Sequence, residues 1–270
     1  MRPDIGIIGG SGFYEFLSEA RTVQVETPFG KPSAAISVGA VGERLVAFLP
    51  RHGKNHEFAP HKVNFRANLW ALRSLGVRQV LAPCAVGALV PELGPGDLVV
   101  PDQVIDRTWG REHTLYSEEG PVVHIGFAEP YCPRLRAAYL RAAAGLPVVD
   151  QGTLVVINGP RFSTRAESLW HRSSGGTVVG MTGMPEAVVA RELAMCYATI
   201  CLVTDHDAGV DGQEAVSHAE VLAAFGKNIG KLKTLIGEVV ATTPEPEHDA
   251  WAQCSCRRAL DGIKLPFELP

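Results

Sequence analysis

Residues 197–207 read Tyr197-Ala198-Thr199-Ile200-Cys201-Leu202-Val203-Thr204-Asp205-His206-Asp207. The apolar run over 197–203, rich in β-branched residues, is typical of a buried strand in a parallel sheet. Ligands of open α/β sheets bind beyond the carboxyl ends of the strands. Asp205 and Asp207 are two residues apart on an extended chain, so their side chains project to the same side. The stretch therefore predicts an α/β fold with a ligand site at this strand end.

The two carboxylates suggest the kind of ligand. Two like charges this close push at least one pKa upward, so we expect one of the two acids to stay protonated near neutral pH. A protonated acid beside an ionised one donates one hydrogen bond and accepts another. Adenine, with a ring nitrogen and an exocyclic amine, needs that combination. The alternative is a solvated turn rich in Asp.

Strand and helix patterns alternate along the whole chain. Further strands are predicted at 5–8, 45–49, 80–88, 97–101, 152–157 and 177–182, and helices at 64–75, 135–144, 185–195 and 219–240. Neither a composition break nor an internal repeat interrupts the alternation, which favours a single α/β domain with a central mixed sheet flanked by helices. We expect residues 1–242 to form this domain, and the Pro-rich residues 243–246 to begin a linker and tail that run to residue 270.

The bulk composition limits the partners. The 270 residues are 46% hydrophobic and carry a formal net charge of -4, which argues against nucleic acid or an acidic membrane as the main partner. No apolar run approaches the roughly 20 residues of a membrane span, and the first residues lack a signal-peptide core. We therefore expect a soluble cytoplasmic protein.

Six cysteines are many for an intracellular chain. The spacing of Cys254-Ser255-Cys256 is tighter than that of the usual zinc-binding pair, and no His cluster accompanies it, so no metal site is predicted. Buried small side chains explain the cysteines as well as a disulfide framework does. Composition leaves both interpretations open.

Three strand ends carry groups that suit a phosphate. Gly9-Gly10-Ser11-Gly12 could wrap an anion with backbone N–H groups, although a tight strand-to-helix turn explains it equally well. Arg51 and His52 follow a second strand, where surface charge is the alternative, and Thr182 follows a third. Arg grips phosphate with two parallel hydrogen bonds. Together the three ends predict a phosphate site.

Other residues suggest a sugar and a base. Met181 could lie under a ribose, and Phe162 could stack on a base beside the Ser163 hydroxyl. The alternatives are a core methionine and a helix entry with Ser163 as the N-cap. Serine-hydrolase and metalloprotease motifs are lacking, so covalent and metal catalysis are unsupported. The pattern favours direct transfer of a sugar between a base and phosphate.

The motifs also support a family resemblance, over about residues 4–240. The chain resembles the trimeric purine nucleoside phosphorylases, most closely their S-methyl-5'-thioadenosine phosphorylase branch. The matching segments are 7–12, 50–53, 159–167, 181–186 and 204–207. The resemblance implies phosphorolysis of a purine nucleoside to free base and pentose 1-phosphate, in purine and methionine salvage. It implies a homotrimer, or a dimer of such trimers, with inorganic phosphate as co-substrate and no cofactor.

The resemblance also assigns residue roles. It implies that phosphate is held by Ser11, Arg51, His52, Cys84, Ala85 and Thr182, although relatives usually carry Thr or another small residue at the position of Cys84. It implies that Met181 contacts the ribose and that the base is surrounded by Phe162, Ser163, Asp205, His206 and Asp207. Asp205 would be the catalytic acid at purine N7, and Asp207 would accept the N6 amine or orient its neighbour.

Two positions bear on specificity. In the family, Asp205 together with Ser163 favours 6-aminopurines over 6-oxopurines. His218 occupies a position where relatives that take ordinary nucleosides donate to the 5'-hydroxyl, so adenosine is expected beside methylthioadenosine. The alternatives are a 6-oxopurine nucleoside phosphorylase, a hydrolytic nucleosidase and a non-catalytic nucleotide-binding module.

The tail cysteines resemble a C-terminal Cys-x-Cys of some heat-stable relatives. That resemblance implies disulfide pairing among Cys132, Cys196, Cys201 and the two tail cysteines, Cys254 and Cys256.

Overall fold

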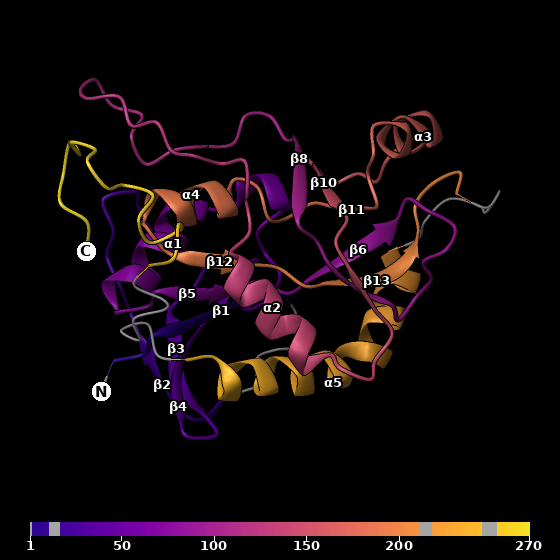
Figure 1. Ribbon diagram of the computed structural model, residues 1–270, viewed down its shortest axis with the longest axis horizontal. Coiled ribbons are helices and arrows are strands. Elements are labelled where there is room, and N and C mark those ends of the chain that lie inside the picture. Colours follow the sequence, from indigo (N-terminus) through magenta and orange to yellow (C-terminus); the bar gives the residue numbers. More distant parts are fainter. Residues whose placement is uncertain (1, 11–16, 211–217, 245–252) are drawn as a thin grey trace.

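The computed structural model describes residues 2–10, 17–210, 218–244 and 253–270. Its strands form two mixed sheets, which the helices flank (Figure 1). The predicted α/β class is confirmed, and the expected central sheet is divided in two. No helix among the described residues is long and apolar enough to cross a membrane.

The first sheet is parallel at its centre and antiparallel at one edge. Its strand order is β12-β5-β1-β4-β3-β2. The bounds are β1 Ile5–Gly9, β2 Ser18–Val23, β3 Ile36–Val41, β4 Arg44–Pro50, β5 Gln79–Leu81 and β12 Cys196–Ala198. All five residues of β1 are buried, as expected for a central strand covered on both faces.

The second sheet carries most of the site. Its order is β8-β10-β11-β6-β13-β7-β9. The bounds are β6 Cys84–Ala88, β7 Leu98–Val100, β8 Gln103–Arg107, β9 Val148–Asp150, β10 Thr153–Ile157, β11 Val178–Gly180 and β13 Cys201–His206. Parallel pairs join β8 to β10 and β6 to β13, while β11 runs antiparallel to β6.

A seam joins the two sheets. The strand predicted over 197–203 is interrupted, so that β12 lies in one sheet and β13 in the other, and β5 and β6 divide in the same way at Pro83. The backbone N–H of Ala82 donates to Ala198 and that of Cys84 donates to Ile200, both at 3.0 Å, so pairing continues across the break. Pro83 has no N–H to donate, and the Thr199 hydroxyl donates to the Ala82 carbonyl at 2.7 Å. The backbone groups of Ala82 and Cys84, on either side of Pro83, therefore keep hydrogen-bond partners despite the interruption.

Helices cover both faces of the first sheet. They are α1 Phe65–Ser74, α2 Pro133–Ala142, α4 Glu186–Glu192 and α5 His218–Thr242, and a 3-10 turn lies at Pro60–Lys62. The helix α3 Arg165–Ser173 lies apart from them, near β8 and β10 of the second sheet (Figure 1). One apolar cluster joins Ile8 of β1 to side chains of α1 and α4. Ile5 and Ile7 belong to a second cluster, which includes side chains of α2 and α5. Because successive strand residues point to opposite faces, this alternation places a helix layer on each side of β1.

Local signals set the helix ends. The Asn64 side chain accepts a hydrogen bond from the Ala67 N–H at 3.1 Å and caps α1, which is followed by Gly76 at φ 108°. At α3, Thr164 and Glu167 form a reciprocal capping box. The N-cap of this helix is therefore Thr164, and the alternative interpretation of Ser163 as the cap is wrong.

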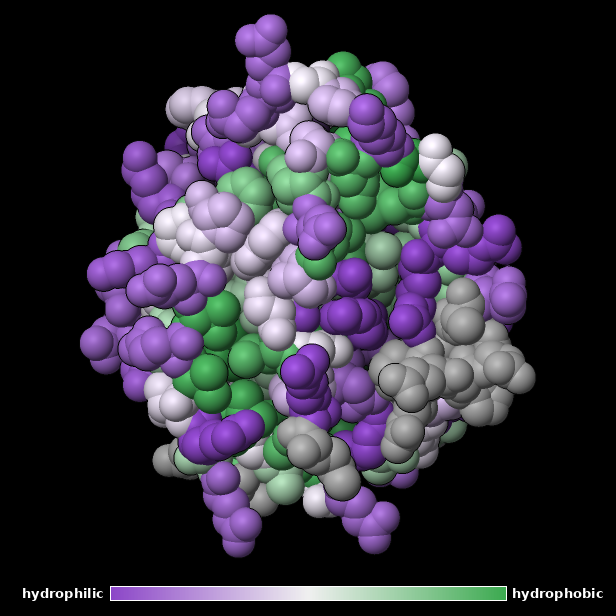
Figure 2. All heavy atoms as spheres, turned by 90° about the vertical axis from the view of Figure 1, so that its left-hand side faces the viewer, coloured by the Kyte–Doolittle hydropathy of each residue, from purple (hydrophilic) through white to green (hydrophobic). Residues whose placement is uncertain are grey.

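The tail packs against the body. The Phe267 ring lies 5.2 Å from the Tyr116 ring and 5.7 Å from the Trp70 ring, centroid to centroid. Apolar side chains gather in patches on the side that carries both termini (Figure 2). Cys254 and Cys256 are buried. Residues 253–270 thus contribute to the apolar core instead of hanging free, while the predicted boundary at residue 242 stays a prediction.

Candidate active site

Two adjoining cavities lie where strands of both sheets end. The larger has a volume of about 150 Å³ and is lined by five of the predicted phosphate residues: Arg51, His52, Cys84, Ala85 and Thr182. The smaller, of about 60 Å³, is lined by Phe162, Met181, Asp205 and Asp207. Ala85 and Val221 line both, so the two cavities form one continuous site.

The strand ends converge as predicted. Arg51 follows β4, Ala85 lies in β6, and Met181 and Thr182 follow β11 directly. Asp205 lies in β13, whose predicted end at Val203 is wrong, because the strand continues through a bulge to His206. A bulge re-aims side chains at a strand end. Here the bulge between Val203 and Asp205 turns the Asp205 side chain toward the smaller cavity.

Arg51 is held in a buried ion pair. Its Nε and Nη2 atoms donate to the two carboxylate oxygens of Glu186 at 2.9 and 3.0 Å, and the Tyr197 hydroxyl donates to the same carboxylate at 2.9 Å. Although burial disfavours the charged guanidinium, the Glu186 carboxylate outweighs it and raises the pKa of Arg51. The pair is neutral as a whole. Because Nη2 and Nη1 also donate to the Ile8 and Pro83 carbonyls at 3.1 and 3.4 Å, the contacts among the described residues leave one N–H of Nη1 for the cavity.

His52 is a neutral imidazole in this site. Its Nδ1 lies 2.9 Å from the Phe58 carbonyl oxygen and donates to it, which leaves Nε2 as an acceptor. Burial, followed by the charge of Arg51, lowers the pKa of His52 to about 4. The ring also stacks on His56, with centroids 4.6 Å apart. His52 therefore offers a hydrogen-bond acceptor at neutral pH instead of a cation.

Asp205 and Asp207 converge on one cavity wall. The Thr204 hydroxyl lies 2.6 Å from Oδ1 of Asp205, and Asp207 is only 3% exposed. A Cβ on Gly87 would lie 3.1 Å from Asp205 Oδ2 and 3.4 Å from the Asp207 Cβ. Gly87 therefore leaves the room that the two acids occupy. The expectation that both project to one side is confirmed.

Met181 and Phe162 form apolar walls of the smaller cavity. A Cβ on Gly159 would lie 2.6 Å from the Met181 sulfur, and Gly159 has φ 64°. Only glycine fits there without moving Met181. Ser163, one residue after Phe162, is 9% exposed, and its hydroxyl has no hydrogen-bond partner among the described residues.

Cys84 lies in the wall of the larger cavity with a thiol that is already engaged. Its Sγ lies 3.4 Å from the Thr199 hydroxyl and 3.6 Å from the Cys201 Sγ. Thiols are weak donors and acceptors. Cys84 therefore shapes the cavity more than it binds an anion. The contact also separates Cys201 from the other cysteines with which pairing was expected, and all six are free thiols in this structure.

Two buried residues escaped the sequence analysis. Glu186 looks like an ordinary acid in the first turn of a helix, and nothing in its spacing shows that it turns inward to Arg51. Arg111 stands in a loop without a motif, yet its guanidinium donates to the Met181 carbonyl at 2.9 Å and the Asn158 carbonyl at 3.0 Å. Burial lowers the pKa of Arg111 to about 10, so it remains charged at neutral pH. Arg111 positions the two loops that carry the sugar and base walls.

Four predicted site residues are not placed in either cavity, and Ser163 is one of them. Ser11 lies outside the described residues, and so does the side chain of His218, whose backbone begins α5. His206 lines neither cavity. Among the described residues, no group of three His, Cys, Asp or Glu side chains gathers at the cavities in a form that could hold a metal ion. What the geometry offers is an anion-binding half beside a half with apolar walls and two acids.

The chain is similar to known proteins over nearly its whole length. The model of the phosphorylase superfamily matches residues 4–241. The chain is 57% identical to an S-methyl-5'-thioadenosine phosphorylase of Mycolicibacterium smegmatis over 98% of this chain and 99% of the relative. It is 53% identical to a purine nucleoside phosphorylase of Streptomyces coelicolor, over 100% and 99%. A solved methylthioadenosine phosphorylase from Schistosoma mansoni in complex with adenine superposes with a TM-score of 0.84, at 41% identity over 89% of this chain and 91% of that chain.

Replacing Glu186 should be costly. Glu186→Gln leaves the buried Arg51 charge without its counter-ion, and we expect a loss of roughly 3–5 kcal/mol in the free energy of unfolding. Urea denaturation followed by circular dichroism measures it. Asp261→Asn is the control, because its pair with Arg258 is exposed at 60% and 58% and should change stability by about 1 kcal/mol or less. Equal effects of the two substitutions would contradict the assigned role of the pair.

His52 should make the fold sensitive to acid. Its pKa is about 4 in the folded chain and 6.5 as a free side chain, so between these values the unfolded chain binds more protons. Stability should therefore fall as pH drops from 6.5 to 4. His52→Asn keeps an N–H for the Phe58 carbonyl but cannot titrate, and we expect it to remove roughly 1–3 kcal/mol of that fall. Denaturation curves at several pH values test this, and parallel curves for the two proteins would contradict it.

Proposed function

This chain belongs to the phosphorylase superfamily, and on that premise we propose that the continuous site carries out phosphorolysis of purine nucleosides, S-methyl-5'-thioadenosine in particular. The observation that supports the proposal is the junction of the two cavities at Ala85 and Val221. Phosphate and nucleoside must meet at the anomeric carbon, and the shared wall brings the two halves into contact. The enzyme is a pentosyltransferase that releases the base for salvage.

The larger cavity receives phosphate. The remaining Nη1 N–H of Arg51 and the Thr182 hydroxyl donate to phosphate oxygens, and Ser11 adds a further donor. The neutral His52 accepts a hydrogen bond from a protonated phosphate oxygen through Nε2. Because the charge of Arg51 is compensated by Glu186, the bound phosphate keeps much of its negative charge.

The smaller cavity receives the nucleoside. Phe162 and Met181, both walls of this cavity, stack on the purine and pack against the ribose, respectively. Ser163, the residue after Phe162, lies beside the base. Asp205 lies at N7, with its Oδ1 held by the Thr204 hydroxyl, and Asp207 accepts from the N6 amine. Oδ2 of Asp207 has no hydrogen-bond partner among the described residues, which suits an acceptor waiting for a ligand amine.

The chemistry follows from these positions. As the bond between C1' and N9 breaks, the sugar gains oxocarbenium character, and the neighbouring phosphate stabilises that positive charge. A phosphate oxygen then forms the new bond to C1', giving the pentose 1-phosphate. The departing purine takes the bonding electrons, and Asp205 delivers a proton to N7 as general acid. Inorganic phosphate is the only co-substrate that this reaction needs, and no cofactor takes part.

Two acids beside the base favour 6-aminopurines. A 6-oxopurine presents a carbonyl oxygen where the Asp207 carboxylate requires a donor, and two acceptors in contact repel each other. Adenosine should be accepted as well, with His218 donating to its 5'-hydroxyl. The S. coelicolor relative is called a purine nucleoside phosphorylase, which keeps 6-oxopurine nucleosides as the second candidate substrate class.

The assembly and location are part of the proposal. A homotrimer, or a dimer of such trimers, is supported by large apolar side chains left exposed, of which Trp109 is 73%, Leu169 49% and Trp170 47% accessible. Nucleoside and phosphate are the partners, and the acidic net charge argues against nucleic acid or an acidic membrane as the main partner. The cytoplasm is the proposed compartment.

A substrate panel tests the function. We expect methylthioadenosine and adenosine to have at least about 10-fold higher kcat/KM than inosine, because the unpaired polar contact costs about 1–3 kcal/mol. No turnover is expected without phosphate. Inosine as the best substrate would favour the 6-oxopurine alternative. Turnover that does not depend on phosphate would favour a hydrolytic nucleosidase.

Asp205→Asn tests the general acid. The amide cannot deliver the proton to N7, and we expect kcat/KM for methylthioadenosine to fall roughly 10²–10⁴-fold while adenine still binds. Asp261→Asn, exposed in the tail, is the matched control and should leave the rate unchanged. Full activity of the Asp205 variant would remove this residue from the mechanism.

A further inference from the structure

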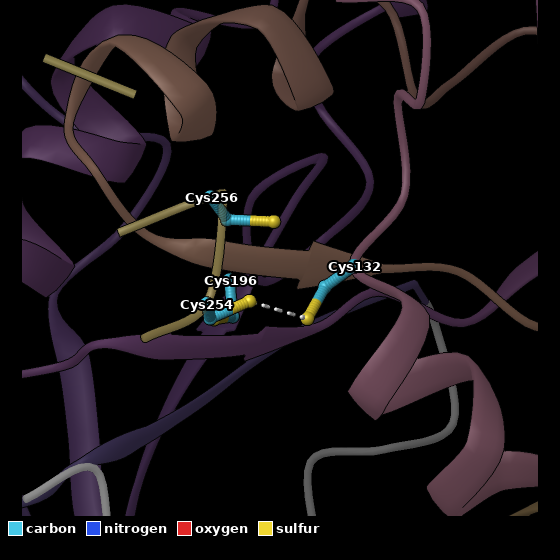
Figure 3. Close-up of side chains that lie close together, drawn as sticks. All are labelled: Cys132, Cys196, Cys254 and Cys256. Carbon is cyan, nitrogen blue, oxygen red and sulfur yellow. Dashed lines mark hydrogen bonds between the residues drawn. The ribbon is translucent and has the colours of Figure 1, made fainter. Parts of the chain in front are cut away.

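Four cysteine thiols meet at the base of the C-terminal tail, outside the site described above. Cys132 precedes α2, Cys196 begins β12, and Cys254 and Cys256 come from the tail (Figure 3). Their Sγ atoms all lie within 4.8 Å of one another, and those of Cys132 and Cys254 are 3.6 Å apart. All four side chains are at most 3% exposed. Apolar packing alone does not require four thiols from three parts of the chain to meet at one point.

The spacing of the sulfurs distinguishes two uses of such a cluster. In a disulfide the two sulfurs are about 2.05 Å apart and each cysteine has one partner. Around a zinc ion, four thiolates at about 2.3 Å from the metal lie roughly 3.8 Å from one another. The observed group, in which every sulfur is near all three others, resembles the second arrangement. In Figure 3 the sulfurs of Cys132, Cys254 and Cys256 point toward a common centre.

The surroundings favour negative charge at this place. Cys132 is the N-cap of the ten-residue helix α2, but its side chain caps no backbone N–H, so the sulfur is available at the positive end of the helix. The guanidinium of Arg191 lies close enough to act on Cys256 electrostatically, and it is held by the carbonyls of Gly126 and Glu129. Both features stabilise thiolates in an otherwise apolar core.

We propose that Cys132, Cys196, Cys254 and Cys256 form a structural zinc site that fastens the C-terminal tail to α2 and β12. Each thiol releases its proton to solvent and forms one sulfur–zinc bond, so four protein ligands close the tetrahedron and no position remains for substrate. The tight spacing of Cys254-Ser255-Cys256 argued against a zinc site in the sequence. These two cysteines, however, supply only half of the ligands. The other half comes from residues that the fold brings beside the tail. The site is independent of the proposed phosphorolysis.

Metal analysis of the full chain tests the proposal. Protein purified under reducing conditions without chelator should contain about one zinc ion per chain by elemental mass spectrometry. The double variant Cys254→Ser/Cys256→Ser should lose at least about 90% of it, because two ligands do not hold a structural ion. Cys201→Ala is the matched control, since Cys201 is equally buried but contacts Cys84 instead of the cluster, and its zinc content should be unchanged.

A second measurement detects the geometry of the metal site by its spectrum. Metal-free wild-type protein titrated with Co²⁺ should develop the absorption bands of a tetrahedral thiolate complex, and excess Zn²⁺ should remove them. Its melting temperature should rise when zinc is added, whereas that of the double variant should not.

Three results would overturn the proposal. The first is metal-free protein with six titratable thiols that gives no cobalt spectrum. The second is two titratable thiols in denatured, unreduced protein, which would show two disulfides in place of the metal. The third is zinc retained in full by the double variant, which would place the ion elsewhere.

Discussion

The ion pair between Arg51 and Glu186 is the interaction on which the anion-binding half of this structure depends. It lies at the meeting point of β1, β4, α4 and β12, because Arg51 also donates to the Ile8 carbonyl and Tyr197 donates to Glu186. Buried charges are tolerated only when they are paired and hydrogen-bonded. The pair therefore fixes the end of β4 relative to the start of α4, and with it the wall of the larger cavity.

The same pair affects the chemistry. In the proposed phosphorolysis, a free arginine would neutralise bound phosphate strongly, whereas an arginine already matched by Glu186 would position phosphate and withdraw less of its charge. In the same proposal His52 acts in the same direction, since it is neutral and its Nε2 is left as an acceptor. A phosphate that keeps its charge stabilises an oxocarbenium-like sugar better. In this proposal the fold orients the phosphate and does not place excess positive charge beside it.

The seam between the sheets provides the space for the site. At Pro83 and Thr199 the strands leave one sheet and enter the other, and Cys84 and Ala85 follow directly. The cavities open at this divergence because the two sheets no longer cover each other's strand ends. The tail packs against the other side of β12. Cys196 therefore faces the thiol cluster, whereas the next residue, Tyr197, donates to the buried carboxylate of Glu186.

The alternation of apolar and polar residues by itself determined the α/β class, the main helices and most strands, and the residues that follow each strand determined which side chains could meet a ligand. Arg51, His52, Thr182, Met181, Phe162 and the two acids needed only their place at strand ends to be recognised as a group. The tertiary structure decided the rest. The local sequence pattern shows neither the buried partners of Glu186 and Arg111 nor the meeting of four distant thiols, because a residue's partner across the fold leaves no periodic signal near it. The division into two sheets likewise depends on how Ala82 and Thr199 lie beside each other, 117 positions apart in the chain and adjacent only once the chain is folded.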